Sequence, residues 1–384
     1  MKVLFAEYLT WGTPYRVGSH YYAQHLLDRG WEVGWLGGEF HLWNLIGNRA
    51  ELARKLPLWR AGGVQHPHGP WEYVPFKSIP YRNAPGLRSP WLAWHGNRLT
   101  LPSIRRQLAL QGYDHADLLW LSNPQAYPWL VETGDYPRVV YRAADNHVLT
   151  AGIPDSIDAV ERHIASRADA VLAVHPDTYE RLSPYAPERT LLLPNGVDLL
   201  RFRAAAPCPS EYGQITDPIA VYVGSVNYRF DVPLLQQAAL RRPGVQFVVI
   251  GDAGIDVSGL QGLPNVHLLG PRPPKQVVGY LTHATAGLIP FRWLPATRNL
   301  RSIKIYEYAA AGLPTVHATM DPETAADMPV ISATGGTDAF VAALDRALGW
   351  DAEQRDQARA FAASNSWEDR YARVDALLSQ WGLA

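Results

Sequence analysis

Short apolar segments of strand length alternate with longer amphipathic segments along most of the 384-residue chain. Strands buried on both faces of a parallel sheet read as continuous runs of Val, Ile and Leu, with covering helices between them. The runs that predict strands are 2–9, 32–37, 117–122, 138–143, 170–174, 190–194, 219–225, 245–251, 266–270, 286–291 and 314–318. Segments 18–30 and 154–167 are typical of the helices between them. The pattern therefore predicts an α/β protein with parallel sheets.

The strands fall into two sets, which predicts two domains. Residues 201–218 separate the sets, are rich in Pro, Ala and polar residues, and show little periodicity, as is typical of a linker. We therefore expect two Rossmann-like domains that face one another across a cleft. In such sheets ligands bind beyond the carboxyl ends of the strands, so the turns that follow the strands are where site residues are expected.

The composition excludes several classes of protein. The chain has a net charge of −1 and no run of about 18 uncharged apolar residues, so a membrane-spanning helix is not expected. Glu7 interrupts the apolar N-terminal stretch, which favours a buried strand over a signal peptide. The single cysteine, Cys208, rules out an internal disulfide framework and suits a reducing cytoplasm. The motifs GxxxxGK[ST], HExxH and D-x-D are absent, which argues against a P-loop NTPase, a zincin and D-x-D-dependent glycosyl transfer.

The segment RSIKIYEYAAAGLPTV, residues 301–316, combines charged residues with a helix start. A helix beginning near Ser302 would carry about half a positive charge at its N-terminus and could hold a phosphate. Arg301 and Lys304 would add cations there, and Glu307, one turn further, could accept hydrogen bonds from two sugar hydroxyls. A nucleoside diphosphate fits this pattern. The alternative is a surface ion pair between Lys304 and Glu307.

Two other turns carry residues suited to chemistry. After the strand 219–225, Gly224 and Ser225 would let backbone amides approach a phosphate, although glycine also ends many buried strands. After the strand 138–143, Asp145 could act as a general base on an acceptor hydroxyl, or it could cap a turn or the next helix.

Two further features lie near the candidate base and in the first turn of the chain. His147 is a second candidate next to Asp145. Gly12 and Gly18 precede an amphipathic helix and could shape a loop over the substrate.

Several of these segments together resemble the GT-B glycosyltransferases over most of the chain. The segments are the glycine-containing N-terminal loop and helix, LLLPNGVD, VYVGSVNYRFD, SIKIYEYAAAGLPTV and the C-terminal SWEDRYARVDALLSQW. The resemblance implies an acceptor-binding domain at 1–203, a nucleotide-sugar-binding domain at 204–365, and a C-terminal helix at 366–384 that packs back on the first domain. Within the superfamily the chain is most similar to the glucuronosyltransferase of xanthan assembly and its relatives.

The resemblance also implies roles for individual residues. Asp145 matches the position of a catalytic aspartate, and Lys304 matches the lysine that meets the donor's phosphate or sugar acid. Glu307 matches the residue that holds the nucleotide ribose. Val226 and Phe291 lie in the two loops that are expected to flank the donor base.

The expected reaction is transfer of a hexosyl or glucuronosyl group from a nucleotide-sugar, a UDP-sugar by expectation, to a hydroxyl of a saccharide or lipid-linked saccharide. No cofactor and no metal are expected. The retaining family carries an earlier glutamate where this chain has Asn299, which favours an inverting mechanism. The alternatives are a retaining GT-B transferase that uses a GDP-sugar, a nucleotide-sugar 2-epimerase, and a catalytically silent sugar-binding subunit.

Residues 40–113 form a basic, tryptophan-containing segment. Its basic side chains far outnumber its two acidic residues, Glu51 and Glu72. Cations mixed with tryptophan are typical of proteins that bind an anionic bilayer surface, which predicts a cytoplasmic protein in peripheral contact with the inner face of the plasma membrane. The alternative is a solvated insertion whose tryptophans belong to the core. Nucleic acid is not an expected partner, because the positive charge is confined to one segment.

Overall fold

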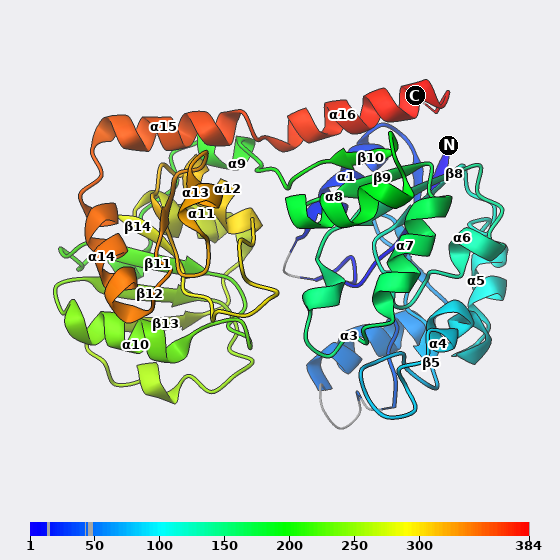
Figure 1. The fold of residues 1–384 in the computed structure, drawn as a ribbon, viewed down its shortest axis with the longest axis horizontal. Helices are drawn as coiled ribbons and strands as arrows, with labels where there is room; N and C mark the ends of the chain where they lie inside the picture. Colours follow the sequence, from blue (N-terminus) through cyan, green and yellow to red (C-terminus); the bar gives the residue numbers. More distant parts are fainter. Residues whose placement is uncertain (14–15, 43, 45–48, 384) are drawn as a thin grey trace. The chain divides into compact units, whose positions relative to one another are not determined.

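The computed structural model describes residues 1–13, 16–42, 44 and 49–383, without the side chains of residues 49 and 50. The chain forms two compact units, Met1–Pro194 together with Arg373–Ala384, and Asn195–Ala372 (Figure 1). Each unit contains a mainly parallel β-sheet with helices packed on it. The predicted α/β fold class is therefore confirmed.

The first unit is built on an eight-stranded sheet with the order β10-β9-β8-β7-β1-β2-β4-β3. The strands are β1 (Lys2–Ala6), β2 (Glu32–Leu36), β3 (Val64–Gln65), β4 (Trp71–Tyr73), β7 (Leu118–Leu121), β8 (Arg138–Ala143), β9 (Ala170–Ala173) and β10 (Thr190–Leu192). All neighbouring strands pair in parallel except β3 and β4. Large aromatic side chains fill the core: Phe5 lies 5.7 Å from Trp35 and 5.3 Å from Trp120 between ring centroids.

Helices cover this sheet. They are α1 (Gly18–Asp28), α3 (Arg49–Arg60), α4 (Trp91–Trp94), α5 (Ile104–Leu110), α6 (Leu130–Thr133), α7 (Ile157–Arg167) and α8 (Pro176–Leu182), with short 3-10 turns η1 (Gly96–Leu99), η2 (His147–Leu149) and η3 (Ser183–Tyr185). A small antiparallel ribbon pairs β5 (Phe76–Lys77) with β6 (Thr100–Leu101). Helix α7 shows why these segments are helical: its buried residues Ile157, Val160, Glu161 and Ile164 recur at the spacing of one helix face.

The second unit has a six-stranded, fully parallel sheet with the order β13-β12-β11-β14-β15-β16. The strands are β11 (Ile219–Val223), β12 (Gln246–Ile250), β13 (Val266–Gly270), β14 (Ala286–Ile289), β15 (Thr315–His317) and β16 (Val330–Ser332). The strand order reverses between β11 and β14, as in doubly wound sheets. The loops at the carboxyl ends of these two strands are therefore the place where a ligand is expected.

The helices of the second unit follow the same alternation. They are α9 (Leu200–Arg203), α10 (Val232–Arg241), α11 (Pro274–Thr282), α12 (Ile303–Ala310), α13 (Pro322–Ala325), α14 (Thr337–Leu348), α15 (Ala352–Ala363) and α16 (Trp367–Gln380), with 3-10 turns η4 (Ser210–Tyr212) and η5 (Ser258–Leu260). The end of α16 belongs to the first unit. There Asp375 lies 3.0 Å from His25 Nε2 and also pairs with Arg29, and Arg138 lies over the Trp381 ring.

The segment predicted as a linker, 201–218, packs on the second unit. Tyr212 is 4% exposed and contacts the edge of the Tyr280 ring, and Glu211 accepts hydrogen bonds from the Tyr280 hydroxyl and Arg272. The first unit ends at Pro194, earlier than the predicted boundary. Pro and Ala give these residues little periodicity, yet they cover the core of the second sheet.

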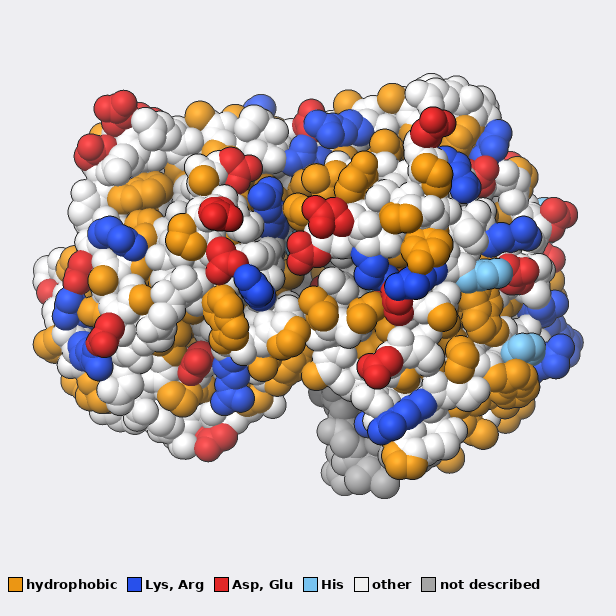
Figure 2. All heavy atoms as spheres, viewed as in Figure 1, with side chains coloured by type: hydrophobic (Ala, Val, Ile, Leu, Met, Phe, Trp, Pro, Cys, Tyr) orange, Lys and Arg blue, Asp and Glu red, His pale blue; other side chains and the backbone are white. Residues whose placement is uncertain are grey.

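The basic segment is partly core. Lys77 is fully buried and its ammonium lies 3.0 Å from Glu39; Lys55 is also buried, and Trp71 is 4% exposed. The arginines with described side chains stay exposed: Arg54, Arg60, Arg82, Arg88, Arg98, Arg105 and Arg106. Trp43 lies outside the described residues. Figure 2 shows hydrophobic, basic and histidine side chains next to one another over the helices of the first unit. In the described part of the chain no helix is long and apolar enough to cross a membrane.

Candidate active site

The N-terminus of α12 is open to an anion. Ser302 is the N-cap residue, but its side chain makes no capping hydrogen bond, and its buried hydroxyl has no partner among the described residues. The backbone N–H groups of Ile303 and Lys304 likewise have no acceptor there. Unsatisfied N–H groups and the helix dipole make such an end a binding site for phosphate. The structure therefore leaves donors where the sequence predicts a phosphate.

Lys304 extends its ammonium beside the loop that follows β11. A Cβ atom added to Gly224 would lie 2.6 Å from Lys304 Cε, so only glycine leaves room for this lysine. The ammonium lies 5.5 Å from the centre of the Tyr222 ring and 5.8 Å from that of Phe291. Burial lowers the pKa of Lys304 to about 8, although Glu307 acts in the opposite direction. No carboxylate of the described residues lies within 4.0 Å of it, so it is available to a ligand.

The loop after β11 offers a backbone amide, that of Ser225, to a ligand. Gly224 N–H donates to Ile250 O at 2.8 Å and Val226 N–H donates to Asp252 O at 2.9 Å, which ties the loop to the end of β12. Within the described part of the chain, the N–H of Ser225 finds no acceptor, while its carbonyl accepts from the Tyr222 hydroxyl. Ser225 can thus donate to a phosphate near Lys304.

The two residues predicted to flank the donor base are both buried. Val226 is 1% exposed and Phe291 is 6% exposed. Both backbone polar groups of Val226 are used, because its carbonyl accepts from Gly254 N–H at 2.9 Å. Contact between these two side chains and the donor base stays a prediction. Because both are buried, they can contribute only a small part of the surface that a base would contact.

Glu307 pairs with a residue that the sequence analysis did not single out. Arg201, on α9, donates to Glu307 Oε1 at 3.3 Å and to Pro274 O at 2.7 Å. The predicted alternative, an ion pair between Lys304 and Glu307, is not formed. Burial raises the pKa of Glu307, and Arg201 and Lys304 act against that rise. The second carboxylate oxygen has no partner among the described residues, so it can still accept a hydroxyl.

Arg301 and Asn299 lie at the same end of α12. The Arg301 side chain is partly buried, its Nε has no partner among the described residues, and its NH2 group lies 3.7 Å from Asp327. Asn299 has a positive φ of 55° and exchanges hydrogen bonds with Asp321. Arg301 therefore supplies a positive charge just before the N-terminus of α12, and its contact with a phosphate stays a prediction.

In the first unit, Asp145 follows β8 and is half-buried. Its carboxylate makes no hydrogen bond or ion pair with any described residue. The caps of the following elements are other residues, Asn146 for η2 and Ser156 for α7. Asp145 therefore does not cap a turn or the next helix. Its carboxylate can act on a ligand.

His147 belongs to a buried network next to Asp145. Its Nε2 lies 2.9 Å from the Tyr8 hydroxyl and its Nδ1 lies 3.0 Å from Glu161 Oε1. Glu161 also accepts from the Tyr141 hydroxyl at 2.5 Å and from Arg181 at 2.9 Å. Burial lowers the pKa of His147, but the charge and hydrogen bond of Glu161 outweigh it, so the pKa is raised overall. The network fixes the His147 ring.

Glu7 is a titratable group that the sequence analysis used only as an interruption of an apolar run. It follows β1, is 3% exposed, and accepts from the Ser122 hydroxyl at 2.7 Å. Burial raises its pKa to about 7, against the effect of Ser122 and Arg142. In the sequence, its position at the end of a predicted strand is the feature that could have indicated a site residue.

The two predicted loop glycines are less informative. Gly18 is buried in the first turn of α1, and a Cβ atom on Gly12 would meet nothing within 4 Å. Residues 14–15, which belong to the loop between them, lie outside the described residues. Their role over the substrate stays a prediction. Among the described residues, no group of three His, Cys, Asp or Glu side chains is placed to hold a metal ion.

Nucleotide binding should depend on pH through Lys304. With a folded-state pKa of about 8, the ammonium is charged below pH 8 and neutral above it, so affinity for UDP should fall as the pH rises through 8. The change is up to about tenfold per pH unit. Calorimetric titration between pH 7 and 10 measures it. The variant Lys304→Met should bind more weakly at pH 7 and lose the dependence; an unchanged dependence in this variant would contradict the role of Lys304.

Comparison with known proteins supports a carbohydrate-transfer enzyme. A family model described as glycosyl transferases group 1 matches residues 217–349, which include β11 and α12. A Bacillus subtilis (strain 168) protein named "Putative teichuronic acid biosynthesis glycosyltransferase TuaH" is 23% identical over 280 residues, covering 67% of this chain and 70% of that protein.

Solved structures share the fold over the whole chain. Sucrose-phosphate synthase from Thermosynechococcus elongatus has a TM-score of 0.69 at 16% identity and covers 99% of both chains. Anabaena HepE, solved in complex with UDP, has a TM-score of 0.68 at 16% identity and covers 99% of this chain and 100% of its own. These structures have the GT-B fold. The chain therefore has the GT-B fold and is a glycosyltransferase whose residues 217–349 match the group 1 family model.

Proposed function

We propose that the enzyme transfers a sugar from a UDP-sugar to a hydroxyl of a saccharide acceptor. The observation that carries the proposal is the open N-terminus of α12, where two backbone N–H groups and the Ser302 hydroxyl, beside Lys304, have no partners among the described residues. The choice of UDP is supported by HepE, a protein of the same fold whose structure was determined with UDP. The narrower relation to the xanthan glucuronosyltransferase stays a prediction.

On the donor side, the enzyme has to stabilise the negative charge of the leaving diphosphate. When the sugar leaves, negative charge develops on the diphosphate, and preorganised donors lower the barrier most where that charge appears. The N–H groups at the start of α12, the ammonium of Lys304, and the N–H of Ser225 would receive it, with Arg301 as a further cation. With these positive groups in place, the proposed transfer needs no metal ion.

Glu307 would hold the ribose. Arg201 occupies one of its oxygens and orients the carboxylate, which leaves the other oxygen for the ribose hydroxyls. A carboxylate accepts such bonds more strongly than a neutral group does.

Asp145 would act on the acceptor. Its carboxylate, which has no partner in the described part of the chain, would take the proton of the attacking hydroxyl. At the same time the hydroxyl oxygen would bond to the anomeric carbon and the bond to the diphosphate would break. Attack from the side opposite the leaving group inverts the configuration of the anomeric carbon. Inversion is also what the sequence favours, because Asn299 stands where the retaining family has a glutamate. The NMR spectrum of the first product gives the configuration.

A saccharide of a polysaccharide-biosynthesis pathway is the proposed acceptor. It is supported by the name of the Bacillus relative, which refers to biosynthesis of teichuronic acid. Peripheral membrane contact is part of this proposal, since Trp91, Leu101 and Leu110 are 48%, 61% and 65% exposed among the arginines of the first unit. Co-sedimentation with phosphatidylglycerol vesicles tests it, and equal binding to neutral vesicles would contradict it.

A panel of donors tests the function. We expect UDP to raise the unfolding temperature more than GDP or dTDP does, because at equal concentration the nucleotide with the lowest Kd stabilises the folded protein most. At 100 times Kd the gain is about 2.7 kcal/mol. Incubation with UDP-sugars and no acceptor should give slow release of UDP and free sugar. The variant Glu307→Gln should bind UDP about tenfold more weakly, and the exposed Glu323→Gln should not. A changed sugar that stays on UDP would show an epimerase, and no effect of any donor would contradict the proposal.

A further inference from the structure

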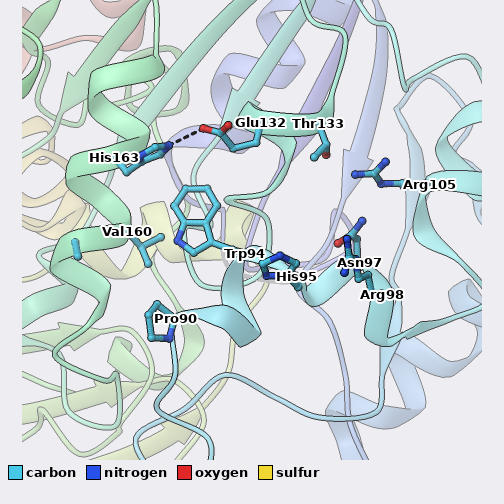
Figure 3. A pocket seen from close by; sticks show the side chains of 11 residues that line it. Pro90, Trp94, His95, Asn97, Arg98, Arg105, Glu132, Thr133, Val160 and His163 are labelled. Carbon is cyan, nitrogen blue, oxygen red and sulfur yellow. Dashed lines mark hydrogen bonds and ion pairs between the residues drawn. The ribbon is translucent and has the colours of Figure 1, made fainter.

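The first unit has a cavity of about 490 Å³ that takes no part in the chemistry described above. It is lined by residues of α4, η1, α5, α6 and α7 and by Pro90 and His95 (Figure 3). The last residues of α6 precede the amino end of β8, whereas Asp145 follows its carboxyl end. The cavity therefore lies in the helical layer and is separate from the turns that carry the candidate catalytic residues.

One wall of the cavity is apolar. Figure 3 shows the Trp94 indole at its centre, with Val160 and Pro90 beside it. The indole is only half-buried, and its ring meets the His163 ring edge-on with 4.9 Å between centroids. An amphipathic aromatic wall of this type can pack on the C–H face of a sugar ring while its rim stays wet.

The opposite side carries unpaired positive charge. Arg98 and Arg105 line the cavity, both are exposed, and neither has a carboxylate partner among the described residues. Arg105 is held against the face of the Trp129 ring, 5.6 Å from its centre. Asn97 lies beside them (Figure 3). Guanidinium groups bind carboxylates with two parallel hydrogen bonds, so this side suits an anionic group.

The cavity also contains an acceptor. Glu132 and His163 line it and lie 2.5 Å apart, with the Glu132 carboxylate turned toward His163 (Figure 3). A lipid phosphate would use only the cations and would leave the aromatic wall and Glu132 without a partner. A sugar that bears a carboxylate uses all three features: the aromatic wall for its ring, Glu132 for a hydroxyl, and the arginines for its charge.

We propose that this cavity binds a hexuronic acid unit of a saccharide chain, as a second carbohydrate site apart from the catalytic residues. Its volume lies within the range of small-molecule sites, about 300–1,000 Å³, and leaves room for more than the charged group alone. Such a site holds an acidic chain while its end reacts elsewhere on the enzyme.

The test uses the full-length protein and two matched probes. One probe is a hyaluronan tetrasaccharide, which carries glucuronate, and the other is the same tetrasaccharide with its carboxylates reduced to alcohols. Calorimetric titration should show the acidic probe binding at least about tenfold more tightly than the reduced one. The double variant R98A/R105A should lose about tenfold or more in affinity for the acidic probe.

The control is R82A/R88A, which removes two arginines of the same segment that are also exposed but do not line the cavity. It should change the affinity less than twofold, which separates the cavity from a general effect of charge. All four replaced arginines are exposed, so both double variants should unfold within about 2 °C of the wild type. UDP should stabilise both double variants as much as it stabilises the wild type. A negative result for the cavity can therefore be told apart from a negative result for the proposed donor site.

Three results would overturn the proposal: equal binding of the two probes, unchanged binding by R98A/R105A, or no binding of the acidic probe at millimolar concentration. Loss of binding to phosphatidylglycerol vesicles in R98A/R105A, with no effect on the saccharide, would assign these arginines to a membrane contact instead.

Discussion

Replacing Asp145 with asparagine should lower kcat by about 10² to 10⁴ and leave the affinity for UDP unchanged. The amide of asparagine has nearly the same shape but cannot take the proton of the acceptor hydroxyl. Because the Asp145 carboxylate has no partner among the described residues, the change should also cost less than about 0.5 kcal/mol of stability. Steady-state transfer assays measure kcat, and titration of UDP measures its affinity.

The control for this experiment is Asp135→Asn, since Asp135 is an exposed aspartate of the same unit. It should leave turnover within twofold of the wild type. Full activity of the Asp145→Asn enzyme would remove this residue from the role of base. Glu7, with its pKa of about 7, would then be the next carboxylate to replace.

The variant Glu161→Gln should destabilise the first unit by about 3–5 kcal/mol. Glu161 is fully buried and accepts from Tyr141, Arg181 and His147 at once. Burial alone would raise the pKa of Glu161, but His147, followed by Arg181 and Tyr141, lowers it, so the carboxylate is ionised in the folded protein. Glutamine would leave buried positive charge without compensation. Urea unfolding, followed by a probe in each unit, measures the loss.

The control for the network is Asp338→Asn, whose side chain is 91% exposed although it also pairs with an arginine. Its effect should stay below about 0.5 kcal/mol. In the Glu161→Gln protein the unfolding midpoint of the second unit, and its stabilisation by UDP, should not change. A loss below about 1 kcal/mol in the first unit would contradict the proposed importance of the network.

The sequence predicts the sheets well because their strands are buried on both faces. The run 138–143 matches β8 residue for residue, and each of the other predicted runs contains or closely overlaps a strand. The missed strands β3, β4, β5, β6 and β16 have two or three residues each, lie near Pro or Gly, and pair at the edge of a sheet or in the small ribbon. Segments of that length carry no readable period.

The site is predicted only in part, for a physical reason. The helix start at Ser302 and the cations beside it can be read locally, because one helix turn places them together. Arg201 pairs with Glu307 from a segment 106 residues earlier in the chain, and no local pattern indicates that contact. Composition likewise could not distinguish the buried Lys77, paired with Glu39, from the exposed arginines around the cavity.

The central claim is that the diphosphate of the donor binds at the start of α12. Hydrogen exchange of the backbone amides with and without saturating UDP tests it most directly. We predict slowed exchange at Ile303 and Lys304 and at Ser225, whose N–H groups have no acceptor among the described residues. Slowed exchange elsewhere, with these three amides unchanged while UDP is bound, would contradict the account.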